Sequence, residues 1–227
     1  GLIVESARTV PEAPPAADLT MVTSDGGLHV GALTNFEFAA PPATPMPAGV
    51  FAYADPLATY AATWSDQAPI SGGADLRLDF TFNRGPAAYD EWTGVGIGCA
   101  STDVSSSSTV VVWLAADVER TVRVRLSSSA YTTAFGGVPS EFGVDVIVGP
   151  VPRAVAIDWV DFSYPPWATA EWSAGQGFPG TEAEARAIVL QSFEGLVFSP
   201  LATVDAVGEL SAPSETGFLR VDNIYFR

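Results

Sequence analysis

Lysine is absent from this sequence: its 10 basic residues are all arginine, against 26 acidic residues and a formal net charge of −16 at pH 7. An acidic surface repels the phosphate backbone of nucleic acids and the head groups of anionic lipids. The composition therefore argues against nucleic-acid binding and against binding to membrane surfaces. Neutral or cationic partners and divalent cations remain compatible with it.

Cysteine, histidine and long apolar runs are also scarce. The single cysteine, Cys99, excludes an internal disulfide framework and a cysteine-rich zinc site, and the single His29 excludes the usual two-histidine metal sites. The longest apolar runs, Val95–Ala100 and Val110–Ala116, fall far short of the roughly 20 residues that cross a bilayer. We therefore expect no membrane insertion.

Apolar residues, in contrast, are plentiful and arranged in short runs. Of the 227 residues, 48% are hydrophobic and 16% charged, which favours one globular domain with a sizeable core. The 21 glycines and 18 prolines lie between these runs, as is typical of β structure. We expect strands at 28–38, 49–53, 59–64, 74–83, 94–100, 109–115, 120–127, 144–148, 154–160, 193–198 and 217–226.

Alternation within these runs predicts half-buried antiparallel strands. Leu76, Leu78, Phe80 and Phe82 are expected on one side of their strand, with Asp75, Arg77, Asp79 and Thr81 on the other. One segment, Glu182–Gln191, is expected to be helical, because Thr181 and Glu184 have the spacing of a capping box. The sequence thus predicts an all-β protein, an antiparallel β-sandwich of the jelly-roll kind with one short helix.

The first 33 residues differ from the rest and predict an extended N-terminal arm (1–33) before the sandwich domain (34–227). Prolines at positions 11, 14 and 15 disfavour helix, and an apolar cluster, Leu2, Ile3 and Val4, precedes them. An ordered arm must dock on something. It either packs along an edge of its own sandwich or adds a strand to a neighbouring copy, and the sequence leaves both open.

Four stations along the chain resemble the β-jelly-roll carbohydrate-binding modules, which have a galactose-binding-domain-like topology. They are the opening Asn35-Phe36-Glu37, the segment Gly49–Asp55, the run Gly94–Gly98 with the Thr102–Ser105 turn and the strand after it, and the closing strand with Asp222-Asn223-Ile224. The resemblance covers about 190 residues from Asn35 to the end of the chain. It implies a jelly roll that binds carbohydrate.

The resemblance also implies a structural Ca²⁺ ion. Many such modules hold it with carboxylates near the first and last strands, and the matching positions here are Glu37 and Asp222. Two chain ends brought side by side supply carboxylate and carbonyl oxygens, the ligands that Ca²⁺ prefers. The alternative is that both are ordinary solvated acids at strand ends.

Sugar binding needs flat aromatic faces, flanked by side chains that hydrogen-bond hydroxyl groups. Trp113 and Trp159 lie within apolar strands and are expected in the core, whereas other aromatic residues lie in polar or proline-rich loops. The ligand-binding candidates are Tyr89, Trp92, Trp167 and Trp172. Each loop tryptophan can alternatively fold back over the core as a lid.

Three further features have more ordinary interpretations. Arg123 and Arg125 alternate outward on one strand and either bond sugar hydroxyls or pair with surface acids, the latter being favoured. Glycines 94, 96 and 98 indicate close backbone packing in a strand, not a dinucleotide motif. Cys99 in the same run is expected to be a buried free thiol.

Catalysis is not predicted. Asp158 with Asp161, and Asp90 with Glu91, are nominal carboxylate pairs for glycoside hydrolysis, but 26 acids produce such pairs by chance. The sequence has no Gly-x-Ser-x-Gly elbow. We therefore expect a secreted, non-catalytic module that binds a neutral polysaccharide or glycan. The alternative is an extracellular filament or surface-layer subunit that assembles through its N-terminal arm.

Overall fold

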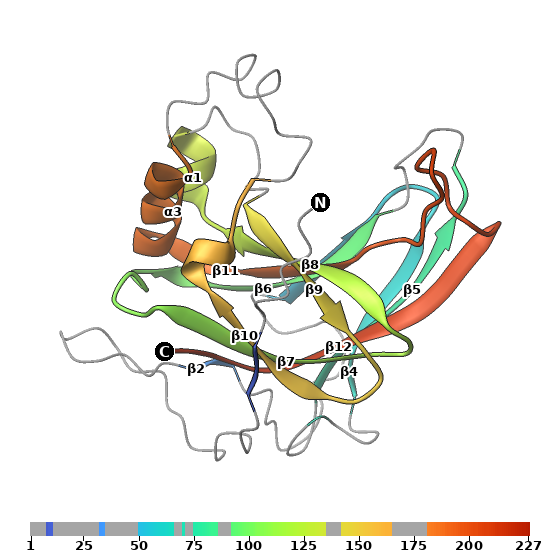
Figure 1. Cartoon of the computed structure of the whole chain (residues 1–227), viewed down its shortest axis with the longest axis horizontal. Helices are drawn as coiled ribbons and strands as arrows, with labels where there is room; N and C mark the ends of the chain where they lie inside the picture. Colours follow the sequence, from blue (N-terminus) through green and yellow to red (C-terminus); the bar gives the residue numbers. More distant parts are fainter. Residues whose placement is uncertain are drawn as a thin grey trace.

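A computed structural model describes residues 8–10, 32–34, 50–65, 70, 75–85, 92–134, 142–164 and 181–227. These residues form two antiparallel β-sheets that face each other as a sandwich (Figure 1). In the described part of the chain, no helix is long and apolar enough to cross a membrane. The predicted all-β sandwich is confirmed.

The five-stranded sheet has the order β3-β6-β11-β8-β9. Its strands are β3 (Val50–Ala54), β6 (Thr93–Thr102), β11 (Phe193–Pro200), β8 (Arg120–Ser127) and β9 (Gly143–Val148). The seven-stranded sheet has the order β1-β10-β7-β12-β5-β4, and β2 also pairs with β12. Its strands are β1 (Arg8–Val10), β10 (Arg153–Asp158), β7 (Thr109–Ala116), β12 (Ser214–Phe226), β5 (Asp75–Asn83), β4 (Thr59–Ser65) and β2 (Ala32–Thr34).

Strict alternation fills the space between the sheets. On β5 the predicted apolar set, Leu76, Leu78, Phe80 and Phe82, is buried, and on β8 Val122, Val124 and Leu126 are buried while the two arginines between them point the other way. The core also takes Trp159, as predicted, whose indole Nε1 donates to Ser107 Oγ at 3.1 Å. Burying these side chains supplies most of the free energy of folding.

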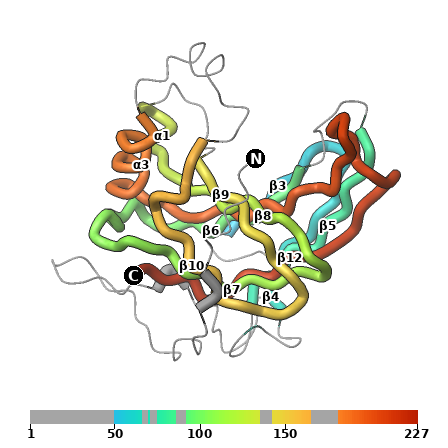
Figure 2. The backbone as a smooth tube through the Cα atoms, in the orientation of Figure 1, coloured from blue at the N-terminus to red at the C-terminus, as the bar shows by residue number. Residues whose placement is uncertain are grey.

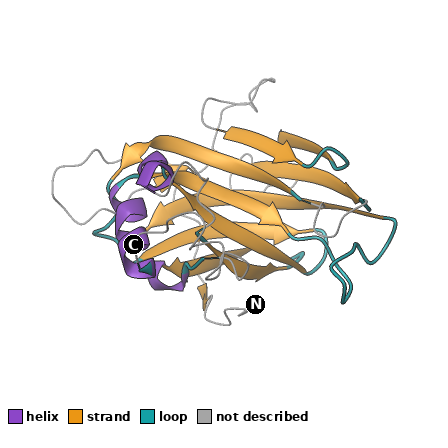
Figure 3. Ribbon diagram, turned by 90° about the horizontal axis from the view of Figure 1, so that it is seen from above, coloured by secondary structure: helices purple, strands orange, loops and turns teal. Residues whose placement is uncertain are grey.

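Two helices lie side by side at one end of the sandwich (Figures 1 and 3). The predicted helix, α3 (Glu182–Gln191), is confirmed with both bonds of its capping box: Glu184 N–H donates to Thr181 Oγ1, and Thr181 N–H donates to Glu184 Oε2. The other helix, α1 (Ser129–Ala134), corrects the expectation of one helix. Ser128 Oγ caps the first turn of α1 by accepting from the N–H of Tyr131 at 3.1 Å, and Glu194 of β11 accepts hydrogen bonds from both N–H and Oγ of Ser129.

The other end of the sandwich carries the β3–β4, β5–β6, β7–β8, β9–β10 and β11–β12 connections. We call it the loop end; the β11–β12 segment, red in Figure 2, lies there, opposite the helices. Backbone bonds join these connections: Arg84 N–H donates to Pro213 O at 3.1 Å, and Ala116 N–H donates to Gly149 O at 2.9 Å. The loop end is therefore a connected surface.

One charged group lies between the sheets at the loop end. The guanidinium of Arg120 donates to Asp117 at 2.7 Å, also bonds Glu215, and lies 5.0 Å from the centre of the Phe80 ring. Burial acts to raise the pKa of Asp117. Hydrogen bonds from Arg120 and from the Phe218 N–H act in the opposite direction and outweigh burial, so the pKa lies below its usual value. These contacts join β8 to β12 across the sandwich.

The arm contributes strand β1, which pairs antiparallel with β10 of the same chain. Thr9 lies opposite Val155, so the segment 8–10 extends the seven-stranded sheet at its edge. The predicted assembly residues, Leu2, Ile3 and Val4, lie outside the described residues. The described segment of the arm pairs with the chain's own sandwich.

Candidate functional site

The outward side of the five-stranded sheet brings aromatic and polar side chains together, and we call it the aromatic face. Two cross-strand rows make it up. One row runs Phe51, Gly96, Val197, Arg125 and Gly143 from β3 to β9. The neighbouring row joins Tyr53 to Gly94, and Ser199 to Arg123 and Asp145.

Two glycines of β6, Gly94 and Gly96, leave the space in which the aromatic rings lie, and we call this pair the glycine seat. A Cβ atom built on Gly96 would lie 2.1 Å from Cζ of Phe51, and one built on Gly94 would lie 2.6 Å from the hydroxyl of Tyr53. No real Cβ tolerates such contacts, so these rings cover β6 only because both positions lack a side chain. The glycine run is closely packed, but at Gly94 and Gly96 side chains make the approach instead of the expected backbone.

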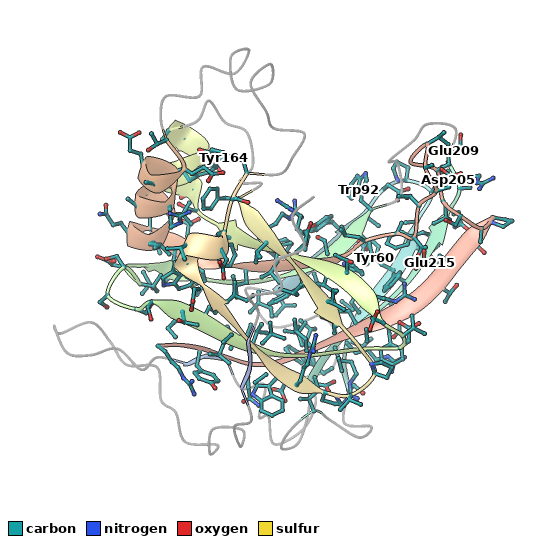
Figure 4. All side chains as sticks on the ribbon, in the orientation of Figure 1. Tyr60, Trp92, Tyr164, Asp205, Glu209 and Glu215 are labelled. Carbon is teal, nitrogen blue, oxygen red and sulfur yellow. The ribbon has the colours of Figure 1, made fainter. Side chains whose placement is uncertain are left out.

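Trp92 extends the row of rings toward the loop end. Its ring centre lies 5.7 Å from that of Tyr53, which lies 6.4 Å from that of Phe51. Phe51 is 47% exposed and Trp92 46% exposed, so these rings are accessible to solvent. Figure 4 shows Trp92 on the loop side of the molecule, away from Tyr164 near the helices. The three rings form a continuous aromatic surface about β6.

Polar groups border these rings on the β8 side. The Tyr53 hydroxyl lies 2.9 Å from Ser199 Oγ, and Nη2 of Arg125 donates to both hydroxyls. The Arg125 guanidinium also lies 5.6 Å from the centre of the Tyr53 ring. One residue along, Arg123 Nη1 donates to Asp145 Oδ1 at 2.9 Å. The expected pairing with an acid is confirmed for Arg123. Arg125 contacts two hydroxyl groups and an aromatic ring.

Of the predicted ligand-binding residues, Trp92 lies on the aromatic face. Tyr89, Trp167 and Trp172 lie outside the described residues, so their role stays a prediction. Sequence reasoning missed Phe51 and Tyr53, which had been used only as a station of the resemblance. The available signal was their alternation on a strand followed by a strand with glycine at every second position.

The other tryptophan expected in the core, Trp113, is only partly buried. It packs against a small second cluster, Val111, Ala154 and Tyr225, on the outward side of the seven-stranded sheet. The expectation of a core position holds only in part, because β7 is buried on both sides and a continuous apolar run carries no alternation to show which side faces the main core.

The predicted calcium ligands are only partly described. Asp222 is fully buried, and its Oδ1 accepts a hydrogen bond from the N–H of Asn223 at 2.8 Å. Glu37 lies outside the described residues. Within the described ranges, no three acidic, histidine or cysteine side chains come together in a way that holds a metal ion. The calcium site therefore stays a prediction.

The remaining candidates among the described residues lie away from the aromatic face. Asp158 ends β10 and accepts a hydrogen bond from Thr109 at 2.8 Å, and Asp161 belongs to the 3-10 turn η1 (Trp159–Asp161). Asp90 and Glu91 are outside the described residues. Cys99 is a free, half-buried thiol packed against the core, and burial, assisted by Glu194, raises its pKa to about 11. Such a thiol stays protonated and unreactive near neutral pH.

Known structures share this architecture at low sequence identity. The family 11 carbohydrate-binding module of the cellulosomal cellulase Lic26A-Cel5E of Clostridium thermocellum has a TM-score of 0.56 and 15% identity, over 88% of this chain and 95% of that one. The family 11 module from C. thermocellum in complex with a β-1,3-1,4-mixed-linked tetrasaccharide has a TM-score of 0.55 and 15% identity, over 86% and 93%.

A third solved structure is the family 30 carbohydrate-binding module of the cellulosomal cellulase Cel9D-Cel44B of C. thermocellum. Its TM-score is 0.52 at 10% identity, over 86% of this chain and 96% of that one. No known family profile and no curated protein sequence matches the chain. The predicted resemblance is confirmed at the level of fold: this chain has the β-jelly-roll fold of carbohydrate-binding modules.

Proposed function

We propose that this protein is a non-catalytic module that binds a neutral polysaccharide on its aromatic face. The observation that carries the proposal is the row of Phe51, Tyr53 and Trp92, which are held over β6 and accessible to solvent. Flat rings of this kind match the apolar faces of sugar rings. The fold shared with carbohydrate-binding modules supports the same conclusion.

The polar border of the face suits hydroxyl-rich ligands. Arginine, serine and tyrosine groups donate and accept hydrogen bonds in fixed positions, which is how a few polar groups orient a ligand on an apolar surface. A neutral ligand is favoured because the chain as a whole carries a net charge of −16, and a strongly anionic polymer approaches such a surface slowly.

We further propose that the module acts outside the cell, and that it attaches to its polysaccharide ligand without cleaving it. The nominal carboxylate pair Asp158 and Asp161 lies at the end of β10 beside α3, where Arg186 donates to Val160 O and Phe162 O. That position is separate from the aromatic face, so a chain lying on the rings does not reach these acids.

Affinity electrophoresis tests the proposal. The purified protein is run through native gels that contain mixed-linked β-glucan, hydroxyethylcellulose, xylan or galactomannan, with serum albumin as a marker that binds none of them. We expect retardation in at least one gel and loss of that retardation when Phe51 and Trp92 are both changed to alanine. Unchanged mobility in all four gels contradicts binding to a neutral polysaccharide, and a double variant that is still retarded contradicts the assigned face.

A further inference from the structure

The carboxylate of Asp55 holds the backbone of Trp92, although Asp55 itself is almost completely buried. Asp55 follows β3 directly and is 5% exposed. Its Oδ1 accepts hydrogen bonds from the N–H groups of Leu57 at 2.7 Å and Ala58 at 2.9 Å. Its Oδ2 accepts from the N–H of Trp92 at 3.0 Å. One buried side chain thus binds two connections that are far apart in the sequence.

The two oxygens of Asp55 have separate tasks. Oδ1 closes the β3–β4 turn in the manner of an Asx turn, together with the bond from Ala58 N–H to Asp55 O. Oδ2 fixes the residue immediately before β6, where the backbone bond from Asp55 N–H to Trp92 O at 3.0 Å continues the pairing of β3 with β6 by one residue. The ring of Trp92 therefore leaves the end of β6 from an anchored backbone.

Anchoring matters here because the ring of Trp92 is itself poorly buried. At 46% exposure, much of the ring meets solvent, and its ring contact is with Tyr53. A ring that is ordered before a ligand arrives loses less conformational entropy on binding. The hydrogen bonds of its N–H and C=O groups fix the backbone from which the ring extends.

We infer that Asp55 is a positioning residue of the aromatic face: it holds Trp92 in line with Tyr53, so that the rings are arranged before a polysaccharide binds. The inference deepens the proposed function and rests on it. Asp55 does not touch the ligand. Its effect on affinity passes through Trp92, because its contacts described here are with the Leu57, Ala58 and Trp92 N–H groups.

The substitution Asp55→Asn separates the two tasks. The amide oxygen of asparagine retains the role of Oδ1 in the turn, while its NH₂ group faces the N–H of Trp92, where two donors oppose each other. Asp55→Ala removes both tasks. Asp205→Asn is the matched control, because Asp205 Oδ1 alone accepts from the N–H groups of Val207 and Glu209 in another loop-end connection. An asparagine oxygen preserves both of those bonds.

The first readout needs no ligand. The protein is labelled with 5-fluorotryptophan, and Trp92→Phe identifies the fluorine signal of Trp92. We expect Asp55→Asn to narrow this signal and move it toward that of free fluorotryptophan, with the signals of the other tryptophans unchanged, whereas Asp205→Asn changes none. A Trp92 signal that is identical in Asp55→Asn and the unchanged protein overturns the inference.

The second readout is a double-mutant cycle on binding to whichever of the four soluble polysaccharides retards the protein. Asp55→Asn is expected to weaken retention by about three- to tenfold, which is within the range of one ordinary hydrogen bond. In a Trp92→Ala background it should have almost no further effect, because its route to the ligand is gone. Equal losses in both backgrounds indicate a general effect on the fold and overturn the positioning role.

The two proposals fail in distinguishable ways. If none of the four polysaccharides is retained, the proposed function is contradicted, and the fluorine signal alone decides whether Asp55 positions Trp92. If a polysaccharide is retained but the cycle is additive, the module binds carbohydrate and the positioning role of Asp55 is wrong. Thermal unfolding of Asp55→Ala, which loses the turn as well, measures the structural contribution separately.

Discussion

The outward sides of the two sheets are built by the same alternation and have opposite properties. On the aromatic face, Phe51 lies over a glycine and is 47% exposed. On the outward side of the seven-stranded sheet, the equivalent ring, Phe218, lies beneath the guanidinium of Arg77, 4.0 Å from its centre. Arg77 pairs in turn with Asp79, and Arg220 with the buried Asp75. We call this second surface the ion-pair face.

The difference teaches what makes a sheet surface available to a ligand. On the ion-pair face, Arg77 pairs with a carboxylate on its own strand and Arg220 with one on the neighbouring strand, so these two cations are engaged within the protein. On the aromatic face, glycines remove side chains from the middle strand, and rings from the edge strand lie across the gap. The first surface stabilises the fold, and the second is open to a partner.

The largest expected effect breaks the ion-pair face. Arg220→Met removes the partner of Asp75, a carboxylate with no exposed surface, and is expected to cost about 3–5 kcal/mol of unfolding free energy because a buried charge is left uncompensated. Urea unfolding measures it. Asp79→Asn breaks a pair whose acid is 45% exposed and should cost less than about 1 kcal/mol. Polysaccharide retention should be unchanged in both; a loss of retention means that the faces are coupled.

Calcium gives the next effect, if Glu37 and Asp222 hold it as the resemblance implies. Saturating Ca²⁺ should raise the stability of the protein by about 2.7 kcal/mol at a concentration one hundred times the Kd, since the folded state alone binds the ion. Thermal unfolding in Ca²⁺ and in chelator measures this, with Glu37→Gln as the control that should lose the difference. Identical unfolding curves in the two buffers rule the site out.

Removing a ring should have opposite consequences on the two faces. Phe51→Ala and Trp92→Ala are each expected to weaken retention about tenfold, or about 1.4 kcal/mol, with little change in stability because both rings are half exposed. Phe218→Ala should leave retention intact and cost about 1 kcal/mol of stability, because Arg77 loses its cation–π contact. Retention gels and urea unfolding of the same three variants test this, and the reverse pattern refutes the comparison.

A smaller change sharpens the role of the glycine seat. Gly96→Ala places a methyl group where the Phe51 ring lies, and the half-exposed ring should turn outward, weakening retention by about threefold. The same change in a Phe51→Ala background should have no further effect. Gly149→Ala is the matched control, because its methyl group meets no described atom within 4 Å. Equal losses from both glycine substitutions would falsify the seat.

The smallest effect is the pH dependence of two acids. Burial, only partly offset by Arg220, raises the pKa of Asp75. As pH falls, the folded protein therefore binds this proton before the unfolded chain does, and the free energy of unfolding increases. Asp117 has a lowered pKa, so its stabilisation is present above the ordinary value and is lost as pH falls toward the folded one. Unfolding free energies of Asp75→Asn and Asp117→Asn between pH 3 and 7 should therefore diverge from the unchanged protein with opposite signs.

Strands with clear alternation could be predicted from the sequence almost to the residue. The expected strand at 120–127 matches β8, and the expected helix matches α3 with its capping box. The β10 segment was predicted two residues too long, because Trp159 and Val160 continue the apolar run but enter the turn η1 instead. The apolar pattern of the sequence does not show that the strand ends before Trp159.

The candidate site was found only in part. Trp92 could be selected because it lies in a polar loop, but Phe51 and Tyr53 looked like ordinary strand residues. Asp75 was expected on the outward side and does lie there, yet it is fully buried through its contacts with Arg220 and the Ile70 N–H. Pairings across 145 residues of chain have no local signal.

The sequence by itself determined the fold class, because strand periodicity and turn residues are local properties of the chain. The tertiary structure decided which outward surface carries exposed rings, because that depends on which strands become neighbours. Gly94 and Gly96 become a seat only when β3 pairs with β6, and Asp55 anchors Trp92 only when the two connections meet. The register of strand pairing brings these residues, which are separate in the sequence, together on one surface.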